Sequence, residues 1–240
     1  MKIRLDRLLV DRGLAESREK AQALIMAGEV LVNGQKASKP GHSVDGDVKL
    51  EVLARPPYVS RGGFKLAGAL ERFGIDPAGM VCLVVGASTG GFTDVLLQHG
   101  AARVHAVDVG SNQLVWQLRT DPRVVVHEQV NARELPPDEI GEPVDLLVCD
   151  VSFISVTLIL PAVVPLLRPE GQMVILIKPQ FEAGKGQVGK GGIVRDPALH
   201  QAACDRVRQA VEQFGFTTEI MDSPIFGAEG NKEFLLHARH

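Results

Sequence analysis

Four charged residues stand where the ends of sheet strands would bring their side chains together. Lys65 lies in RGGFKLAGAL, on a predicted helix before the first strand of a large C-terminal region. Asp150 ends a predicted strand in LLVCDVSF, Lys178 ends another in VILIKPQFE, and Glu233 begins the last one in GNKEFLL. In an open α/β sheet such strand ends can converge beside a ligand crevice. Because any one of them alone is more simply an edge ion pair, the prediction of a catalytic site depends on the whole set.

A Lys-Asp-Lys-Glu set suits the transfer of a methyl group to a ribose 2′-hydroxyl. This hydroxyl is a poor nucleophile, and its proton must leave as the oxygen attacks the methyl donor. We assign Lys178 as the candidate general base, so its pKa must fall from ~10.4 towards neutrality through burial and the charge of Lys65. Asp150 and Glu233 would orient the lysines and the hydroxyl, and their charges would oppose that pKa shift.

A glycine-rich loop follows the first strand of the same region. The strand Val81–Val85 runs into GASTGGF, and glycines are needed where a backbone turns tightly and approaches a ligand. The spacing differs from the dinucleotide pattern and is similar to the first motif of S-adenosylmethionine methyltransferases. Asp108 ends the next strand, where a carboxylate would bind the ribose hydroxyls of the cofactor. The residues that we expect to bind S-adenosylmethionine are Gly86, Ser88, Thr89, Gly90, Gly91, Phe92, Asp108, Val109, Asn131 and Asp150.

Val84 departs from this motif. Such methyltransferases usually carry an aspartate two residues before the first glycine, and here that position is Val84. The carboxylate would help to hold the amino-acid end of the cofactor. Its loss leaves two alternatives, which are weaker cofactor binding or compensation by a neighbouring group.

Residues 61–240 alternate short apolar runs with helical segments. The predicted strands are Val81–Val85, Val104–Val107, Val124–His127, Leu146–Cys149, Met173–Ile177, Thr217–Met221 and Phe234–Ala238, and the helices Thr93–His99, Leu114–Leu118, Val156–Leu167 and Ala198–Phe214. This alternation predicts an α/β fold with a mostly parallel sheet and helices on both faces. The last two strands are expected to form an antiparallel pair at one edge.

Residues 1–53 predict a small α+β domain. Apolar residues at helical spacing from Ile3 to Leu9 indicate a first helix that Gly13 can end. Ser17 is a suitable N-cap for a second helix. A strand at Val30–Val32 then runs into Asn33-Gly34, a strong hairpin-turn signal, and a last strand is expected at 48–53.

This front region resembles the S4 RNA-binding domain. The matching segments are RLDRLLVDRGLAESREKAQALIMAGEVLVNG and DGDVKL. The resemblance implies docking on folded RNA through its shape and phosphates, with contacts expected from Arg4, Arg7, Arg18 and Lys20. Residues 1–60 carry ten Lys and Arg against eight Asp and Glu, whereas the rest of the chain is acidic. The alternative is a small interaction domain whose arginines are only solvated.

A Pro-Pro pair marks a predicted linker over residues 54–60. It cannot continue a helix and favours an extended connection to the domain at 61–240. Tyr58, in this linker, is expected to pack against one of the domains. Trp116 is likewise expected to pack beside Leu114 and Leu118 rather than to stack on a base.

The composition predicts a cytoplasmic protein without metal ions or membrane spans. The three cysteines are widely spaced, which favours buried thiols over disulfides or metal ligands. No signal peptide or membrane span is recognised, and the histidines form no metal-binding motif. GKGQVGKG at 184–191 lacks the hydroxyl residue of a P-loop, so it is expected to be a loop beside the site. Its Lys185 and Lys190, with Arg195, either contact RNA phosphate or are simply exposed.

The whole chain resembles the TlyA family, also labelled hemolysin A, whose catalytic domain is similar to the FtsJ ribose methyltransferases. The resemblance rests on the S4-like region and on SRGGFKL, GASTGGFTD, AVDVG, CDVSFIS, IKPQFEAG and GNKEFLLH. It implies methylation of cytidine 2′-hydroxyls in ribosomal RNA, with Lys65, Asp150, Lys178 and Glu233 as the catalytic tetrad. Two alternatives remain, an RNA-binding or ribosome-assembly protein with weak or lost activity, and a pore-forming cytolysin, which the missing signal peptide and membrane segments oppose.

Overall fold

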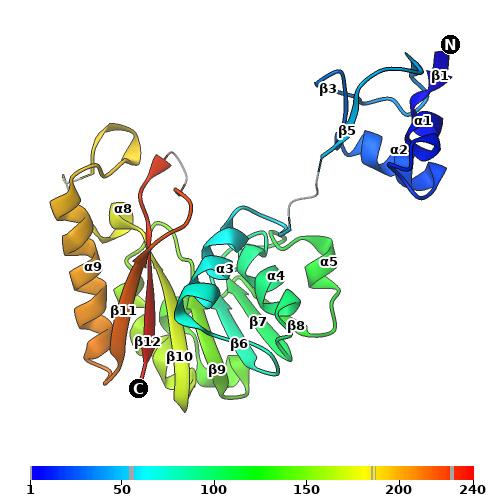
Figure 1. The fold of residues 1–240 in the computed structure, drawn as a ribbon. Coiled ribbons are helices and arrows are strands. Elements are labelled where there is room, and N and C mark those ends of the chain that lie inside the picture. Colours follow the sequence, from blue (N-terminus) through cyan, green and yellow to red (C-terminus); the bar gives the residue numbers. More distant parts are fainter. Residues whose placement is uncertain (1, 54–56, 185, 187, 228–229) are drawn as a thin grey trace. The chain divides into compact units, whose positions relative to one another are not determined.

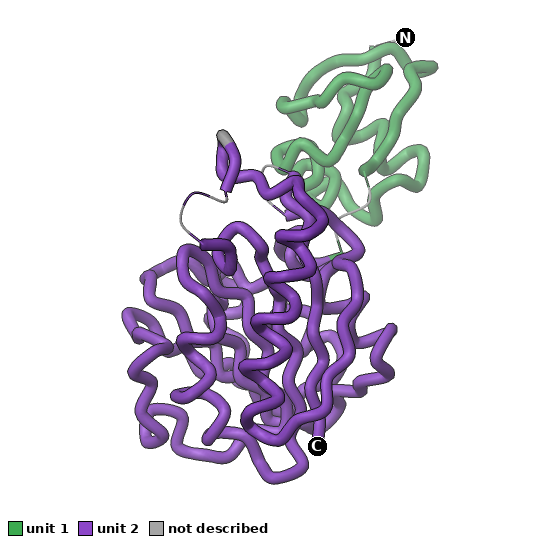
Figure 2. Tube along the Cα trace, turned by 90° about the vertical axis from the view of Figure 1, so that its left-hand side faces the viewer, with its two compact units in different colours: residues 1–57 green, residues 58–240 purple. Residues whose placement is uncertain are grey.

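The computed structural model describes residues 2–53, 57–184, 186, 188–227 and 230–240, and divides the chain into two compact units. The first unit is Met1–Pro57 and the second is Tyr58–His240 (Figure 2). Residues 54–56 of the predicted linker lie outside the described residues. Tyr58 and Val59 belong to the second unit and pack against its core. Tyr58 also makes an edge-to-face contact with Phe64, so its packing role is confirmed.

The first unit packs two helices against short antiparallel strands. Its elements are β1 (Lys2–Arg4), α1 (Leu5–Asp11), α2 (Arg18–Met26), β2 (Val30–Val32), β3 (Gln35–Lys36), β4 (Ser43–Asp45) and β5 (Leu50–Val52). The Ser17 hydroxyl accepts a hydrogen bond from the Lys20 amide at 3.2 Å, which confirms the predicted N-cap. Asn33 and Gly34 both have positive φ, as the predicted hairpin turn requires. The first helix begins later than predicted, because Ile3 pairs with Val44 as part of β1.

The second unit is built on a seven-stranded sheet in the order β11-β12-β10-β9-β6-β7-β8 (Figure 1). Its strands are β6 (Val81–Val85), β7 (Arg103–Asp108), β8 (Val124–Glu128), β9 (Val144–Cys149), β10 (Leu167–Ile177), β11 (Thr217–Asp222) and β12 (Phe234–Arg239). The strands from β6 to β10 are parallel, whereas β12 is antiparallel to both β10 and β11. The predicted α/β class and the antiparallel edge pair are therefore confirmed.

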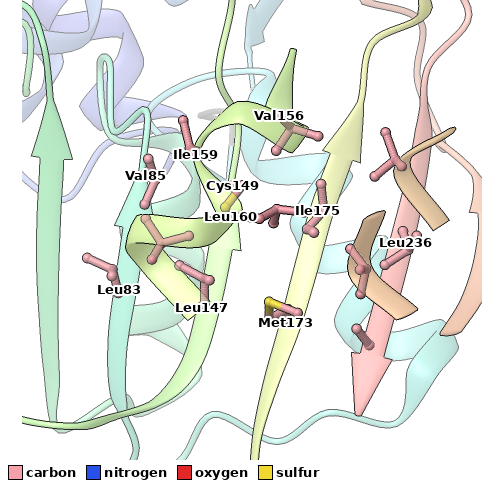
Figure 3. Close-up of a cluster of buried hydrophobic side chains, with 14 of the residues drawn as sticks. Leu83, Val85, Leu147, Cys149, Val156, Ile159, Leu160, Met173, Ile175 and Leu236 are labelled. Carbon is pink, nitrogen blue, oxygen red and sulfur yellow. The ribbon is translucent and has the colours of Figure 1, made fainter. Parts of the chain in front are cut away.

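Helices cover both faces of this sheet because buried side chains alternate along its strands. One face packs beneath α3 (Gly62–Phe73), α4 (Gly91–Gln98) and α5 (Trp116–Arg119). The other packs against α6 (Pro137–Ile140), α7 (Leu160–Val163) and α9 (Pro197–Glu212). Figure 3 shows part of this second layer, where side chains of neighbouring strands meet Val156, Ile159 and Leu160. The three cysteines are buried and free, as expected.

Two predictions for this unit were wrong. The segment 156–167 is not one helix: the 3₁₀ helices η2 (Val156–Leu158) and η3 (Val164–Leu166) flank the short α7. Pro161 and Pro165 lack the amide hydrogens that a continuous helix would use, and each stands in the first turn of a new segment. Trp116 does not pack, since 75% of it is exposed, whereas Leu118 on the same short helix and Leu114 before it are buried.

Two further findings concern only the described residues. They include no helix with both the length and the apolar character needed to cross a membrane. They also include no group of three or more His, Cys, Asp or Glu side chains placed to hold a metal ion.

Candidate active site

A cavity of about 520 Å³ opens at the carboxyl edge of the parallel strands. Residues from the ends of β6, β7 and β9 line it, together with the loop after β8. The predicted cofactor residues that it brings together are Gly86, Ser88, Asp108, Val109, Asn131 and Asp150. This is the position at which open α/β sheets bind their ligands.

The glycine loop fits close against the end of β9. Gly86 has a φ of +84°, and a Cβ there would lie only 2.3 Å from the Asp150 carbonyl oxygen. A side chain at this position would therefore push the loop away from Asp150 and alter the cavity floor. The Ser88 amide, in the same loop, donates a hydrogen bond of 2.8 Å to Asp108 Oδ2. The backbone thus holds the loop and the predicted ribose-binding carboxylate together.

Asp108 is fixed at both of its carboxylate oxygens. Its Oδ1 accepts a 2.8 Å hydrogen bond from the Gly110 amide, and Oδ2 accepts the bond from Ser88. Each oxygen can accept more than one hydrogen bond, so the carboxylate can still bind hydroxyl groups from the cavity. Asn131, on the same cavity, caps the 3₁₀ helix η1 (Ala132–Glu134) by accepting from the Arg133 amide.

Four predicted cofactor residues are not among the described residues that line this cavity. Thr89 is exposed on the loop, and Gly90 and Gly91 are buried at the start of α4. Phe92, on α4, is buried in the core between the sheet and the helices that cover it. Val84, where the motif usually has a carboxylate, is also fully buried in that core. Gly90, Gly91, Phe92 and Val84 are therefore packed within the protein, whereas Thr89 is exposed on the loop.

The four predicted catalytic residues form two ion pairs. Lys178 Nζ lies 2.5 Å from Asp150 Oδ1 and donates a 2.8 Å hydrogen bond to the Ser152 hydroxyl. Lys65 Nζ lies 2.5 Å from Glu233 Oε2, and both of these side chains are almost completely buried. Each lysine is thus held by its own carboxylate.

A second cavity of about 430 Å³ adjoins the first. Lys65, Lys178 and Glu233 line it, with aromatic side chains from Phe153 and Phe181. Ser152 and Phe153 line both cavities, while Asp150 lines the first. The Lys178–Asp150 pair therefore stands where the two cavities meet.

Asp150 Oδ1 has unused accepting capacity at this junction. The atom is buried, and among the described residues it accepts no well-aligned hydrogen bond. Its contact with Lys178 therefore joins two charges rather than a directed donor and acceptor. Because buried acceptors in proteins are normally satisfied, this oxygen is suited to a ligand hydroxyl.

Several lining residues were missed by the sequence prediction. They include Gln113, Arg133, Ser152, Phe153, Phe181 and Asn231. The position of Ser152 and Phe153 directly after Asp150 was an available signal. The others lie in loops or in a short helix, where no periodicity indicates which way a side chain points.

In the first unit, ion pairs restrain the predicted RNA-contact residues. Arg4 and Arg18 both bind the buried carboxylate of Asp6, at 2.9 and 3.0 Å. The Arg4 hydrogen bond holds the pKa of Asp6 well below its usual range. Arg7 pairs with Asp11 and Lys20 with Glu16. About half or more of each of the four basic side chains remains exposed.

Part of the loop that was expected beside the site falls outside the described residues. The structure does not describe Lys185, nor the side chain of Lys190. Arg195 is exposed, and Val188 and Gly192 line the second cavity. The next α-helix after this loop begins only at Pro197, so the arrangement differs from that of a P-loop.

Comparison with protein families defines the class of both units. A model described as FtsJ-like methyltransferase matches residues 58–240, and a model of the S4 domain matches residues 3–49. The TlyA 16S/23S rRNA (cytidine-2′-O)-methyltransferase of Mycobacterium tuberculosis is 50% identical over 98% of this chain and 89% of its own length. Hemolysin A of Brachyspira hyodysenteriae is 45% identical over 98% and 99%. The chain belongs to the TlyA family of FtsJ-like methyltransferases that carry an S4 domain.

Solved structures agree with this assignment. A Streptococcus thermophilus protein named “putative hemolysin” has a TM-score of 0.76 and 46% identity, covering 99% of this chain and 88% of that one. A Bacillus cereus O-methyltransferase in complex with SAH has a TM-score of 0.52 at 16% identity, covering 76% and 82%. The second likeness shows the fold alone, which is that of S-adenosylmethionine-dependent methyltransferases.

Proposed function

We propose that this protein transfers the methyl group of S-adenosylmethionine to the 2′-hydroxyl of a cytidine in ribosomal RNA. The observation that carries the proposal is the Lys178–Asp150 pair at the junction of two cavities. Relatives at 50% and 36% identity are named as rRNA (cytidine-2′-O)-methyltransferases. We expect the reaction to take place in the cytoplasm, where ribosomal RNA is found.

The first cavity is suited to the cofactor. Asp108 can accept further hydrogen bonds from ribose hydroxyls. Gly86 has no Cβ, so the loop can lie close against Asp150. Asn131 and Val109 lie on the same wall. The bound cofactor supplies an electrophilic methyl group on a sulfonium centre. Val84 contributes no carboxylate for the amino-acid end of the cofactor.

Lys178 is the proposed general base. As the 2′-oxygen takes the methyl group and the donor is left as a neutral thioether, the proton would pass from that oxygen to Lys178 Nζ, and Asp150 would balance the resulting ammonium charge. The amine must be neutral before it can accept this proton. Lys65 and Glu233 would orient the hydroxyl in the second cavity.

Transfer of labelled methyl to ribosomal subunits tests the proposal. The wild-type protein should incorporate label at a ribose 2′-oxygen, and Lys178→Ala should lose this activity while it still binds the cofactor. Equal incorporation by the two proteins would remove Lys178 as the base.

A second candidate is an RNA-binding or ribosome-assembly protein with weak or lost activity, and Val84 is the observation that favours it. Calorimetric titration with S-adenosylmethionine separates the two candidates. The absence of binding at millimolar cofactor would overturn the enzyme proposal and leave the RNA-binding one.

A further inference from the structure

The segment 151–154, here called the partition, separates the two cavities. Ser152 and Phe153 line both of them. Phe153 has a φ of +67° and is 93% exposed, which is an unusual combination for a large aromatic residue. A backbone in this region persists only where the surrounding contacts hold it. Something must therefore fix the partition from both ends.

The two ends of the partition are anchored differently. At its start, the Asp150 amide donates a 2.9 Å hydrogen bond to the carbonyl of Val85 in β6. At its end, the Val156 amide donates to Glu182 Oε1 at 2.8 Å, and the Ser155 hydroxyl donates to Glu182 Oε2 at 2.5 Å. One carboxylate therefore holds the far end through both of its oxygens.

Glu182 connects this end to the element that follows Lys178. It is the last residue of α8 (Pro179–Glu182), which begins directly after Lys178. Its side chain is only 3% exposed, and it is not among the described residues that line either cavity. Burial raises the pKa of Glu182, against the hydrogen bonds from Ser155 and Val156. Burying a carboxylate is costly unless its oxygens accept hydrogen bonds, so the two bonds from Ser155 and Val156 matter for the geometry.

We propose that Glu182 is a positioning residue. It fixes the partition relative to Lys178, so that the two cavities keep the alignment that the reaction needs. The proposal rests on the proposed methyl transfer. Ser152 accepts a hydrogen bond from Lys178, so a shift of the partition would also turn the lysine away from its working position. A misplacement of about 1 Å between reacting groups can lower a rate by about 100-fold.

Three substitutions test this role. Glu182→Ala should lower kcat by about 100-fold, with little change in cofactor Kd or in KM for RNA. Glu182→Gln should restore most of kcat, because its amide oxygen can accept from Val156 and its amide nitrogen can donate to Ser155. Asp145→Ala is the matched control. Asp145 accepts from the Val81 amide at 2.8 Å and pairs with Arg168, but it stands at the other end of β9.

Chymotrypsin cleavage supplies a readout that needs no activity. The protease cuts after phenylalanine and requires a segment that can leave its anchored conformation. Glu182→Ala should speed cleavage after Phe153 by about tenfold relative to cleavage after Phe226, which is 63% exposed and serves as the internal reference. Asp145→Ala should leave this ratio unchanged.

The outcomes separate the two proposals. A wild-type protein without methyl transfer would overturn the proposed function. An active wild type with an equally active Glu182→Ala, or a loss of kcat without faster cleavage after Phe153, overturns the positioning role. If Glu182→Ala does not fold, Ser155→Ala removes one of the two bonds and should shift both readouts in the same direction. Unchanged values in that variant overturn the role as well.

Discussion

Removing the carboxylate of Glu233 should lower both the melting temperature and the methyl-transfer activity, and these two effects can be separated. The side chain of Glu233 is 2% exposed and that of Lys65 is 10% exposed, at 2.5 Å from each other. Glu233→Ala leaves a buried ammonium without its partner, which typically costs about 3–5 kcal/mol. Since each kcal/mol shifts the melting temperature of a unit of this size by about 2–4 °C, we expect a decrease of roughly 6–20 °C.

A double substitution separates the two effects. Apolar replacement of a buried ion pair is often neutral for stability. Lys65→Met combined with Glu233→Met should therefore recover most of the lost melting temperature, yet remain inactive in methyl transfer. Scanning calorimetry of the full chain measures the first quantity, and label incorporation into ribosomal subunits measures the second.

Two results would refute this reasoning. If Glu233→Ala has the same melting temperature as the wild type, the pair is not buried as described. A double variant with wild-type activity would show that Lys65 and Glu233 serve stability alone. Partial folding does not confuse the test, because the double variant is scored only if its melting temperature has recovered.

Three further predictions follow from other parts of the chain. Gly86→Ala should abolish cofactor binding in calorimetry while the protein stays folded, because its Cβ would lie 2.3 Å from the Asp150 carbonyl oxygen. Burial lowers the pKa of His237 from its usual 6.5, so protonation favours the unfolded chain. The free energy of unfolding should therefore fall as the pH decreases below about 6.5, and His237→Gln should flatten this dependence in denaturant titrations at each pH. Deletion of residues 1–53 should abolish methylation of ribosomal RNA but spare cofactor binding, and full activity of the truncated protein would contradict a docking role for the S4 domain.

The strands of the sheet could be predicted because they are buried. Runs such as Val81–Val85 and Leu146–Cys149 are apolar throughout, as expected for parallel strands covered on both faces. The position of Asp150 and Lys178 at strand ends then followed from the sequence. The broken segment at 156–167 was missed because its apolar spacing outweighed two prolines, which interrupt helical hydrogen bonding.

Contacts between loops could not be predicted in the same way. Glu182 reads as an ordinary charged residue after Lys178, and no periodicity indicates that it is buried or that it holds Val156. Trp116 shows the opposite case, since a large aromatic residue on a short helix is exposed. Both depend on how a short segment is rotated, which tertiary contacts decide rather than local propensity.

The pairing of the catalytic side chains depends on the direction of one strand. Glu233 precedes β12, which runs antiparallel to β10, and Phe234 lies opposite Ile177 in their register. The start of β12 therefore meets the end of β10, so Glu233 and Lys178 come to the same edge of the sheet. A parallel β12 would have placed Glu233 at the far edge, away from Lys65. The antiparallel direction of β12 thus brings the fourth charged side chain to a site that otherwise holds two lysines and one carboxylate.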